Sequence, residues 1–209
     1  MLPVGPRIGL RVGLTGGLAS GKSFVGRTLA GFGCTLIQAD LLGRQALMPD
    51  GGAYHPVIAE FGRDLLDESQ QIDRRKLAAR VFDFPDRLAA LNKLVHPCVY
   101  KMEEDLAVAA FANDPTGIVV VEAAILIETG SYKKYDRLIL AVCTEEQQLQ
   151  RAMDRDALTL EEVKARLRRQ MPLAEKRKYA HYVIDTSSTK ENTIQQTRQV
   201  YESLRSVQV

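Results

Sequence analysis

Residues 16–23 read Gly-Gly-Leu-Ala-Ser-Gly-Lys-Ser and match the pattern G-x-x-x-x-G-K-[ST]. A β-rich run that ends at Leu14 precedes this segment, and a helical stretch follows it. Glycine at positions 16 and 21 permits backbone conformations that turn successive amides toward an anion. The helix N-terminus adds positive potential, the Lys22 ammonium reaches the β- and γ-phosphates, and the Ser23 hydroxyl suits magnesium. The segment therefore predicts a strand, a loop that binds the phosphates of a nucleoside triphosphate, and a helix that begins near Lys22.

The phosphate loop by itself does not identify a reaction. Motor, switch and transferase proteins share it, so residues outside the loop must separate these classes. The candidate ATP-binding residues in the loop are Gly16, Gly17, Leu18, Ala19, Ser20, Gly21, Lys22 and Ser23.

β-rich runs alternate with helical stretches along most of the chain. We expect strands at residues 11–14, 35–39, 118–121, 137–142 and 182–185. This alternation predicts an α/β fold with a parallel sheet of about five strands, covered by helices on both faces. We expect residues 1–209 to form one domain, whose nucleotide-binding core comprises residues 7–39 and 116–209.

A helical insert and a small helical lid complete the predicted organisation. In residues 40–115 apolar side chains recur at helical spacing, as at Leu77, Val81, Leu88, Leu91 and Val95. Prolines and glycines, Pro97 among them, are expected between the helices of this insert. Residues 151–172 form the predicted lid, and Thr159 with Glu162 predicts a capping box at the start of one of its helices.

Composition narrows the classes of partner. With 45% hydrophobic residues, 26% charged residues and a formal net charge of +2, the chain gives no indication of nucleic-acid or anionic-membrane binding. Residues 1–10 have no signal-peptide core, and residues 118–127 are too short to span a bilayer. The three cysteines form no C-x-x-C pair, which favours free thiols. We expect a cytoplasmic protein.

Two acidic residues stand where predicted strands end. The carboxyl ends of parallel strands face the ligand crevice, so Asp40 would lie beside the phosphate loop and accept or orient the proton of an attacking hydroxyl. Its alternative role is a helix N-cap. Glu122 follows the third strand and could hold a magnesium-bound water. The alternative for Glu122 is a buried glutamate paired with an arginine, and Glu128 is expected to be structural.

Basic residues supply further candidates. Arg151 and Arg155 lie four residues apart on one helix face, from which a guanidinium could close over the transferring phosphate. A solvated basic face is the alternative. Arg74 would by default lie at the surface, although an acceptor that carries a pyrophosphate would need such a group. An isolated histidine such as His96 more often belongs to a core or a cap than to a ligand site.

With these residues lined up, the chain resembles the dephospho-coenzyme A kinases from about Val12 to Ser188. The family's opening Leu-Thr-Gly-Gly-x-x-Ser-Gly-Lys-Ser stands at residues 14–23, and its Ala-Asp strand end stands at residues 39–40. The acid two residues before the family's Pro-Leu-Leu-x-Glu matches Glu122, and the final Glu of that motif matches Glu128. Arg155-Asp156 with Gln170 resembles the family's lid. The insert resembles the family's coenzyme-binding region at Phe61-Gly62, Ile72-Asp73-Arg74, Leu77, Phe82, Leu91 and His96-Pro97.

The chain departs from the family pattern at several positions. Ala19 replaces a glycine of the loop, a change expected to preserve the loop if this residue keeps a negative φ. Gln38 replaces the first acid of Asp-Ala-Asp, which leaves Asp40. The other departures are Ala124 for proline, Ala180-His181 for Ala-Asp, and Asp185-Thr186-Ser187-Ser188 for Asn-x-Gly near the adenine site.

The resemblance implies transfer of the ATP γ-phosphate to the ribose 3′-hydroxyl of dephospho-coenzyme A, the last step of coenzyme A synthesis. It implies Asp40 as base or orienter, and Lys22, Arg155 and magnesium as carriers of charge. Ser23 and Glu122 are the candidate residues for holding Mg²⁺. Arg74 and His96 fall in the acceptor-binding insert, and the protein would be a monomer or small homo-oligomer. Two alternatives stay open: another small-molecule kinase, such as a nucleotide kinase, and a nucleotide-dependent switch without phosphotransfer.

Overall fold

The computed structural model describes residues 9–81 and 83–207. Residues 1–8, which include the start of the expected core, and Phe82 lie outside the described part. The described residues fall into two compact units: the chain up to Ile37 together with the chain from Ala109, and Gln38–Val108. The second unit begins two residues before the predicted insert and ends seven residues before the end of that insert. The boundary after Val108 falls inside a long helix, Pro85–Asn113.

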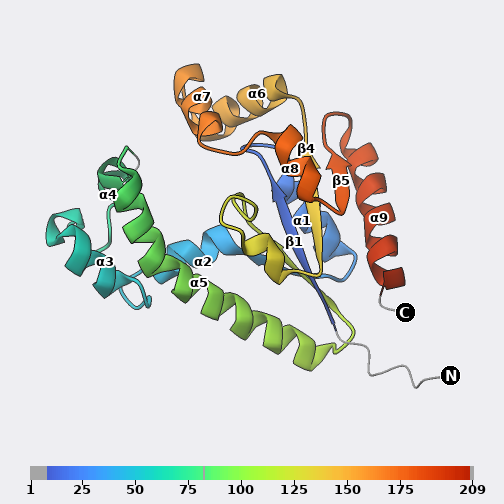
Figure 1. Ribbon diagram of the computed structural model, residues 1–209, viewed down its shortest axis with the longest axis horizontal. Coiled ribbons are helices and arrows are strands. Elements are labelled where there is room, and N and C mark those ends of the chain that lie inside the picture. The colour runs from blue at the N-terminus through green and yellow to red at the C-terminus, as the bar shows by residue number, and fades with distance from the viewer. Residues whose placement is uncertain (1–8, 82, 208–209) are drawn as a thin grey trace. The chain divides into compact units, whose positions relative to one another are not determined.

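The first unit is built on a five-stranded sheet with the strand order β2-β3-β1-β4-β5. Figure 1 labels three of these strands, β1, β4 and β5. Parallel pairs join β1 to β3, β1 to β4 and β4 to β5. The strands are β1 (Leu10–Gly16), β2 (Thr35–Gln38), β3 (Ile118–Glu122), β4 (Arg137–Val142) and β5 (Tyr182–Asp185). The predicted α/β fold and its five strands are confirmed, with small differences at the strand ends. β2 ends one residue early, at Gln38, β3 includes Glu122, and β1 extends one residue before and two residues after the predicted range.

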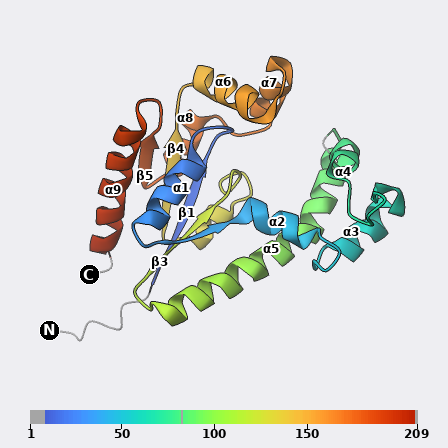
Figure 2. The same cartoon turned by 180° about the vertical axis from the view of Figure 1, so that it is seen from behind.

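Helices cover this sheet on both faces. α1 (Lys22–Gly31) and α9 (Lys190–Val207) pack side by side on one face, and the short α8 (Leu173–Lys176) lies on the other (Figures 1 and 2). The core between the sheet, α1 and α9 is apolar, since it buries Val12, Leu14, Leu29, Ile139 and Leu204 among others. The predicted start of a helix at Lys22 is confirmed.

Two helices occupy the predicted lid region. They are α6 (Glu145–Asp156) and α7 (Leu160–Arg168). The predicted capping box is present at the start of α7: the Thr159 hydroxyl accepts from the Glu162 amide, and the Glu162 carboxylate accepts from the Thr159 amide. Further 3-10 turns lie at Arg63–Leu65, Ser131–Lys134 and Arg177–Tyr179.

The second unit is helical, as predicted. Its helices are α2 (Ala39–Ala46), α3 (Tyr54–Phe61), α4 (Arg74–Val81) and most of α5 (Pro85–Asn113). Leu77 and Val81 belong to its buried core, and Leu88, Leu91 and Val95 pack against that core. Asp73 Oδ1 accepts hydrogen bonds from the amides of Arg75 at 2.8 Å and Lys76 at 3.2 Å, and so caps the start of α4.

The expectation that Pro97 separates two helices is wrong. Pro97 lies inside α5, a continuous helix of 29 residues. A proline removes one backbone hydrogen bond from a helix, but neighbouring residues can hold the helix by packing. Val95 and Cys98 pack against the core of this unit and Val99 is buried, which supplies that packing.

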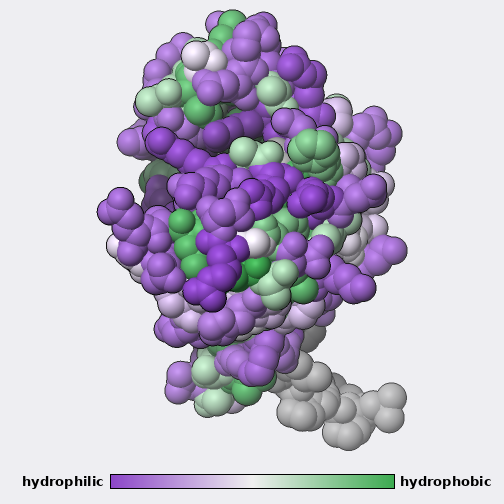
Figure 3. All heavy atoms as spheres, turned by 90° about the vertical axis from the view of Figure 1, so that its left-hand side faces the viewer, coloured by the Kyte–Doolittle hydropathy of each residue, from purple (hydrophilic) through white to green (hydrophobic). Residues whose placement is uncertain are grey.

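The surface is mainly polar on the face that Figure 3 presents, where hydrophilic side chains predominate and hydrophobic residues form separate patches between them. Among the described residues, none of the helices combines the length and the apolar character that a membrane span requires.

Candidate active site

The phosphate loop connects the carboxyl end of β1 to the first turn of α1, as its sequence predicts. Gly21 is the N-cap of α1 and has a φ of 82°, a left-handed conformation that favours glycine. A Cβ at Gly16 would lie 2.6 Å from the carbonyl oxygen of Ala141 in β4, so a side chain has no room there. Both glycines of the pattern are therefore required by the backbone.

Ala19 differs from the expectation. Its φ is 52°, so the condition of a negative φ at this position is not met. An L-residue with a Cβ in this region is strained by contact with its own backbone. The loop consequently keeps its shape with an alanine in a conformation that suits glycine better.

Hydrogen bonds from distant segments hold the middle of the loop. The Leu18 amide donates to Gln170 Oε1 at 2.9 Å, and Gln148 Nε2 donates to the Leu18 carbonyl at 2.7 Å. The Thr186 hydroxyl donates to the Ser20 carbonyl at 3.0 Å and accepts from the Arg151 guanidinium at 3.1 Å. Arg151 thus supports the loop through the chain after β5, a role that spacing along a helix did not indicate.

Two polar side chains at the start of α1 have partners within the first unit. Lys22 Nζ donates to the Gly17 carbonyl at 2.8 Å, and the Ser23 hydroxyl donates to Glu122 Oε1 at 2.6 Å. Glu122 ends β3 and is only 7% exposed. Ser20, in contrast, has a buried hydroxyl without a hydrogen-bond partner among the described residues.

These residues fit ATP and a divalent cation. The loop combines a helix N-terminus with glycines that leave the backbone accessible, which suits phosphate oxygens. Ser23 and Glu122 place a hydroxyl and a carboxylate oxygen together, and oxygen atoms are the donors that Mg²⁺ prefers.

In the region predicted to be a lid, Arg155 is paired with its neighbour Asp156. Its Nε and Nη2 donate to the two carboxylate oxygens of Asp156 at 2.8 and 2.9 Å, and Arg166 Nη1 lies 3.5 Å from the same carboxylate. The hydrogen bonds from Arg155 hold the pKa of Asp156 below its ordinary value, with help from the charge of Arg166. The Arg155 side chain is still 59% exposed, which leaves the guanidinium accessible.

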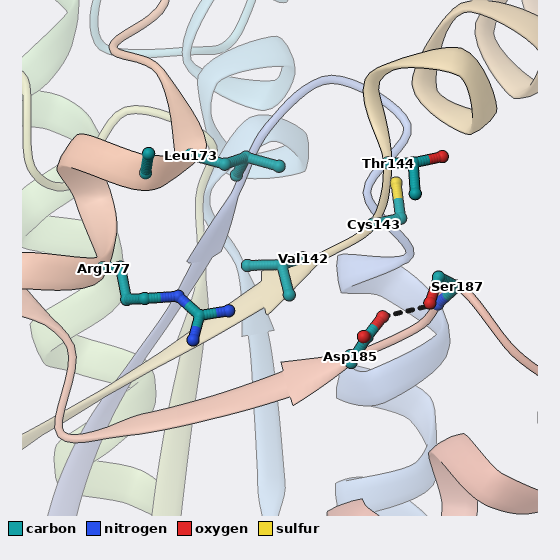
Figure 4. A pocket seen from close by; sticks show the side chains of 8 residues that line it. Val142, Cys143, Thr144, Leu173, Arg177, Asp185 and Ser187 are labelled. Atoms are coloured by element: carbon teal, nitrogen blue, oxygen red, sulfur yellow. Dashed lines mark hydrogen bonds between the residues drawn. The ribbon is translucent and has the colours of Figure 1, made fainter.

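A hollow of about 300 Å³ opens beyond the carboxyl ends of β4 and β5. Val142 and Leu173 give it apolar walls, and Arg177 faces Asp185 and Ser187 across it (Figure 4). The Ser187 amide donates to Asp185 Oδ1 at 2.8 Å, which fixes the turn after β5. Burial raises the pKa of Cys143, which also lines this hollow.

Three predicted residues lie in the other unit. Asp40 is an exposed residue in the first turn of α2, so it does not end β2, and the N-cap of this helix is Gln38. The alternative of Asp40 as an N-cap is therefore wrong. Arg74 is exposed at the start of α4. His96 is half-buried in α5 with its ring centroid 5.8 Å from that of Tyr100.

Similarity to known proteins identifies the family of this chain. A family model described as dephospho-CoA kinase matches residues 10–192. The chain belongs to the dephospho-CoA kinase family. It is 40% identical over 191 residues to a dephospho-CoA kinase from Carboxydothermus hydrogenoformans, covering 91% of this chain and 90% of that protein. A dephospho-CoA kinase from Aquifex aeolicus is 37% identical over 194 residues, with 93% and 97% covered.

A solved structure agrees with this family at the level of fold. The dephospho-CoA kinase from Campylobacter jejuni superimposes with a TM-score of 0.67 and 26% identity, covering 95% of this chain and 98% of that one. As a member of the dephospho-CoA kinase family, the chain is a kinase and so a transferase.

Proposed function

We propose that the chain transfers the γ-phosphate of ATP to the ribose 3′-hydroxyl of dephospho-coenzyme A, which yields coenzyme A and ADP. The observation that carries this proposal is the phosphate loop in its strand-loop-helix setting, inside a chain that matches the dephospho-CoA kinase family over residues 10–192. In the reaction, the hydroxyl oxygen bonds to the γ-phosphorus, and the bond between that phosphorus and the oxygen that bridges to the β-phosphate breaks.

The first unit would bind ATP. The loop amides and the N-terminus of α1 receive the phosphates, and Lys22 exchanges its hydrogen bond to the Gly17 carbonyl for phosphate oxygens. Ser23 and Glu122 are the residues that would hold Mg²⁺, which offsets negative charge on the phosphates when it is bound. Arg155 would leave Asp156 to neutralise charge that develops on the transferring group.

The hollow beside β4 and β5 fits the base of ATP. Its apolar walls suit a flat ring, and the Arg177 guanidinium can stack on such a ring. Its residues follow the two strands on one side of the sheet, where α/β proteins bind nucleotides. Asp185 and Ser187 stand where the family has Asn-x-Gly, and their turn would present backbone groups to the base edge.

The second unit would bind the acceptor. Arg74 is available for the pyrophosphate of dephospho-coenzyme A, and His96 is a candidate contact on α5. Asp40 would accept or orient the proton of the 3′-hydroxyl. We also propose that the protein is a cytoplasmic monomer or small homo-oligomer without nucleic-acid or membrane partners.

A product-resolved assay tests this function. ATP-Mg²⁺ is supplied with dephospho-coenzyme A or with nucleoside monophosphates, and ADP release is coupled to product identification. We expect coenzyme A from the first acceptor and negligible turnover of the second. Preferential use of a nucleoside monophosphate would make the chain a nucleotide kinase, and ATP binding without a phosphorylated product would make it a switch.

A charge-only substitution tests Asp40. Asn matches Asp in shape but lacks its basicity, so Asp40→Asn should keep ATP affinity and lose about two to four powers of ten in turnover. Asp50, an exposed acid after α2, supplies the matched control Asp50→Asn, which should leave turnover unchanged. Wild-type turnover in a folded Asp40→Asn variant would remove Asp40 from the mechanism.

A further inference from the structure

Lys176 is a fully buried lysine at the end of α8, with an exposed fraction of 0%. A charged amine in a protein interior is unfavourable unless acceptors surround it. Its Nζ lies 2.8 Å from Glu128 Oε1, 2.8 Å from the Ala124 carbonyl and 3.4 Å from the Gly16 carbonyl. The three acceptors match the three protons of an ammonium group.

These acceptors come from three segments that surround the nucleotide site. Gly16 ends β1 and opens the phosphate loop, while Ala124 follows the strand that ends in Glu122. Glu128 Oε1 also accepts a hydrogen bond from the Met171 amide at 3.1 Å, near the end of the predicted lid, residues 151–172. The Lys176 ammonium therefore connects the beginning of the phosphate loop, at Gly16, to the segment after β3 that contains Ala124 and Glu128.

The contact between Lys176 and the Gly16 carbonyl affects a phosphate-binding amide, because that carbonyl and that amide belong to the same peptide unit. Because a peptide unit is planar, an interaction that holds the Gly16 carbonyl also holds the Gly17 amide, the next N–H of the loop. We propose that Lys176 is a positioning residue, which keeps the start of the phosphate loop in its phosphate-binding geometry and links it through Glu128 to Met171, near the end of the predicted lid. It acts through Gly16 and touches no substrate.

Glu128 argues against a simple electrostatic role for Lys176. Its carboxylate lies 2.8 Å from the ammonium, so the pair presents little net charge to the phosphates. Its side chain is 21% exposed, and its contacts agree with the structural role expected from the sequence. Positioning and long-range attraction can be separated, because they predict different effects when Glu128 loses its charge.

ATP affinity of the full chain, measured by calorimetry beside urea unfolding, tests the proposal. Lys176→Met keeps the length of the side chain and removes the ammonium, and we expect ATP affinity to fall about tenfold or more. Lys178→Met is the matched control, since that lysine is 66% exposed and pairs with Glu175 at the surface. It should bind ATP as the wild type does.

A double variant separates positioning from stability alone. Lys176→Met combined with Glu128→Gln removes both charges, so it should regain stability lost to an unpaired carboxylate but not regain ATP affinity. A merely structural lysine predicts that affinity returns together with stability. Recovery of affinity in the double variant, or wild-type affinity in a folded Lys176→Met variant, would overturn the proposal.

Glu128→Gln alone keeps the test decisive even if Lys176→Met does not fold. The positioning role predicts ATP affinity within about threefold of wild type, because an amide oxygen can still accept from Lys176. Tighter ATP binding would mean that the ammonium acts through its field, and so would refute positioning. The inference rests on ATP binding in the proposed function, and these measurements contain no dephospho-coenzyme A, so their failure leaves the proposed acceptor untouched.

Discussion

Replacing alanine by glycine usually lowers stability, but the left-handed conformation of Ala19 predicts that Ala19→Gly raises it. An L-residue at a φ of 52° loses about 1–2 kcal/mol relative to a right-handed conformation. Glycine avoids this strain but has more freedom in the unfolded chain, which costs about 0.5–1 kcal/mol. Ala19→Gly should therefore increase the free energy of unfolding by about 0.5–1 kcal/mol.

Thermal unfolding of the nucleotide-free protein measures this effect, because bound nucleotide would itself shift the midpoint. For a chain of this length the expected rise in Tm is about 1–4 °C. Ala109→Gly is the matched control, since Ala109 is an exposed residue inside α5. The control should lower stability by about 1 kcal/mol. A fall in Tm for both variants would refute the reasoning about Ala19.

Three further predictions follow from single contacts. Gly16→Ala places a Cβ 2.6 Å from the Ala141 carbonyl oxygen, so ATP affinity measured by calorimetry should fall at least about tenfold. Gly31 has open space around it, so the control variant Gly31→Ala should bind ATP as the wild type does. Arg155→Ala should reduce turnover far more than ATP affinity if the guanidinium acts on the transition state, and unchanged steady-state kinetics would place Arg155 on a solvated face. Burial raises the pKa of Cys34 to about 12, so its thiol should stay protonated at about pH 8 and react with a thiol reagent more slowly than Cys98 and Cys143. Rapid labelling of Cys34 in the native protein, located by mass spectrometry, would contradict its burial.

The sequence predicted the sheet well because its strands have a strong local signal. The run Ile118-Val119-Val120-Val121 is β-branched and apolar, and it became a strand whose every residue is buried. The phosphate loop was equally predictable, since its glycines and Lys22 have fixed positions in the pattern. These elements are determined by residues close together in the chain, and such local patterns can be recognised in a single sequence.

Tertiary packing decided the features that the sequence did not predict. Pro97 is a strong local signal for a helix end, yet packing around Val95 and Val99 continues the helix through it. Lys176 lies in the run Glu175-Lys176-Arg177-Lys178, which resembles a solvated face. Its burial is explained by acceptors from distant segments, two carbonyls and the Glu128 carboxylate, and Gln148 was missed because its partner is also distant in sequence.

The phosphate loop lies near the beginning of the chain, whereas the side chains that hold it in place, such as Thr186 and Lys176, lie near the end. Thr186 is 166 residues from Ser20, and Lys176 is 160 residues from Gly16. A ribosome releases the N-terminal part first, and contacts between distant segments form only after both have emerged. During synthesis the loop is therefore exposed with its sequence complete but most of its supports absent. Nucleotide in the cell would then stabilise the finished chain and give little help to the growing one.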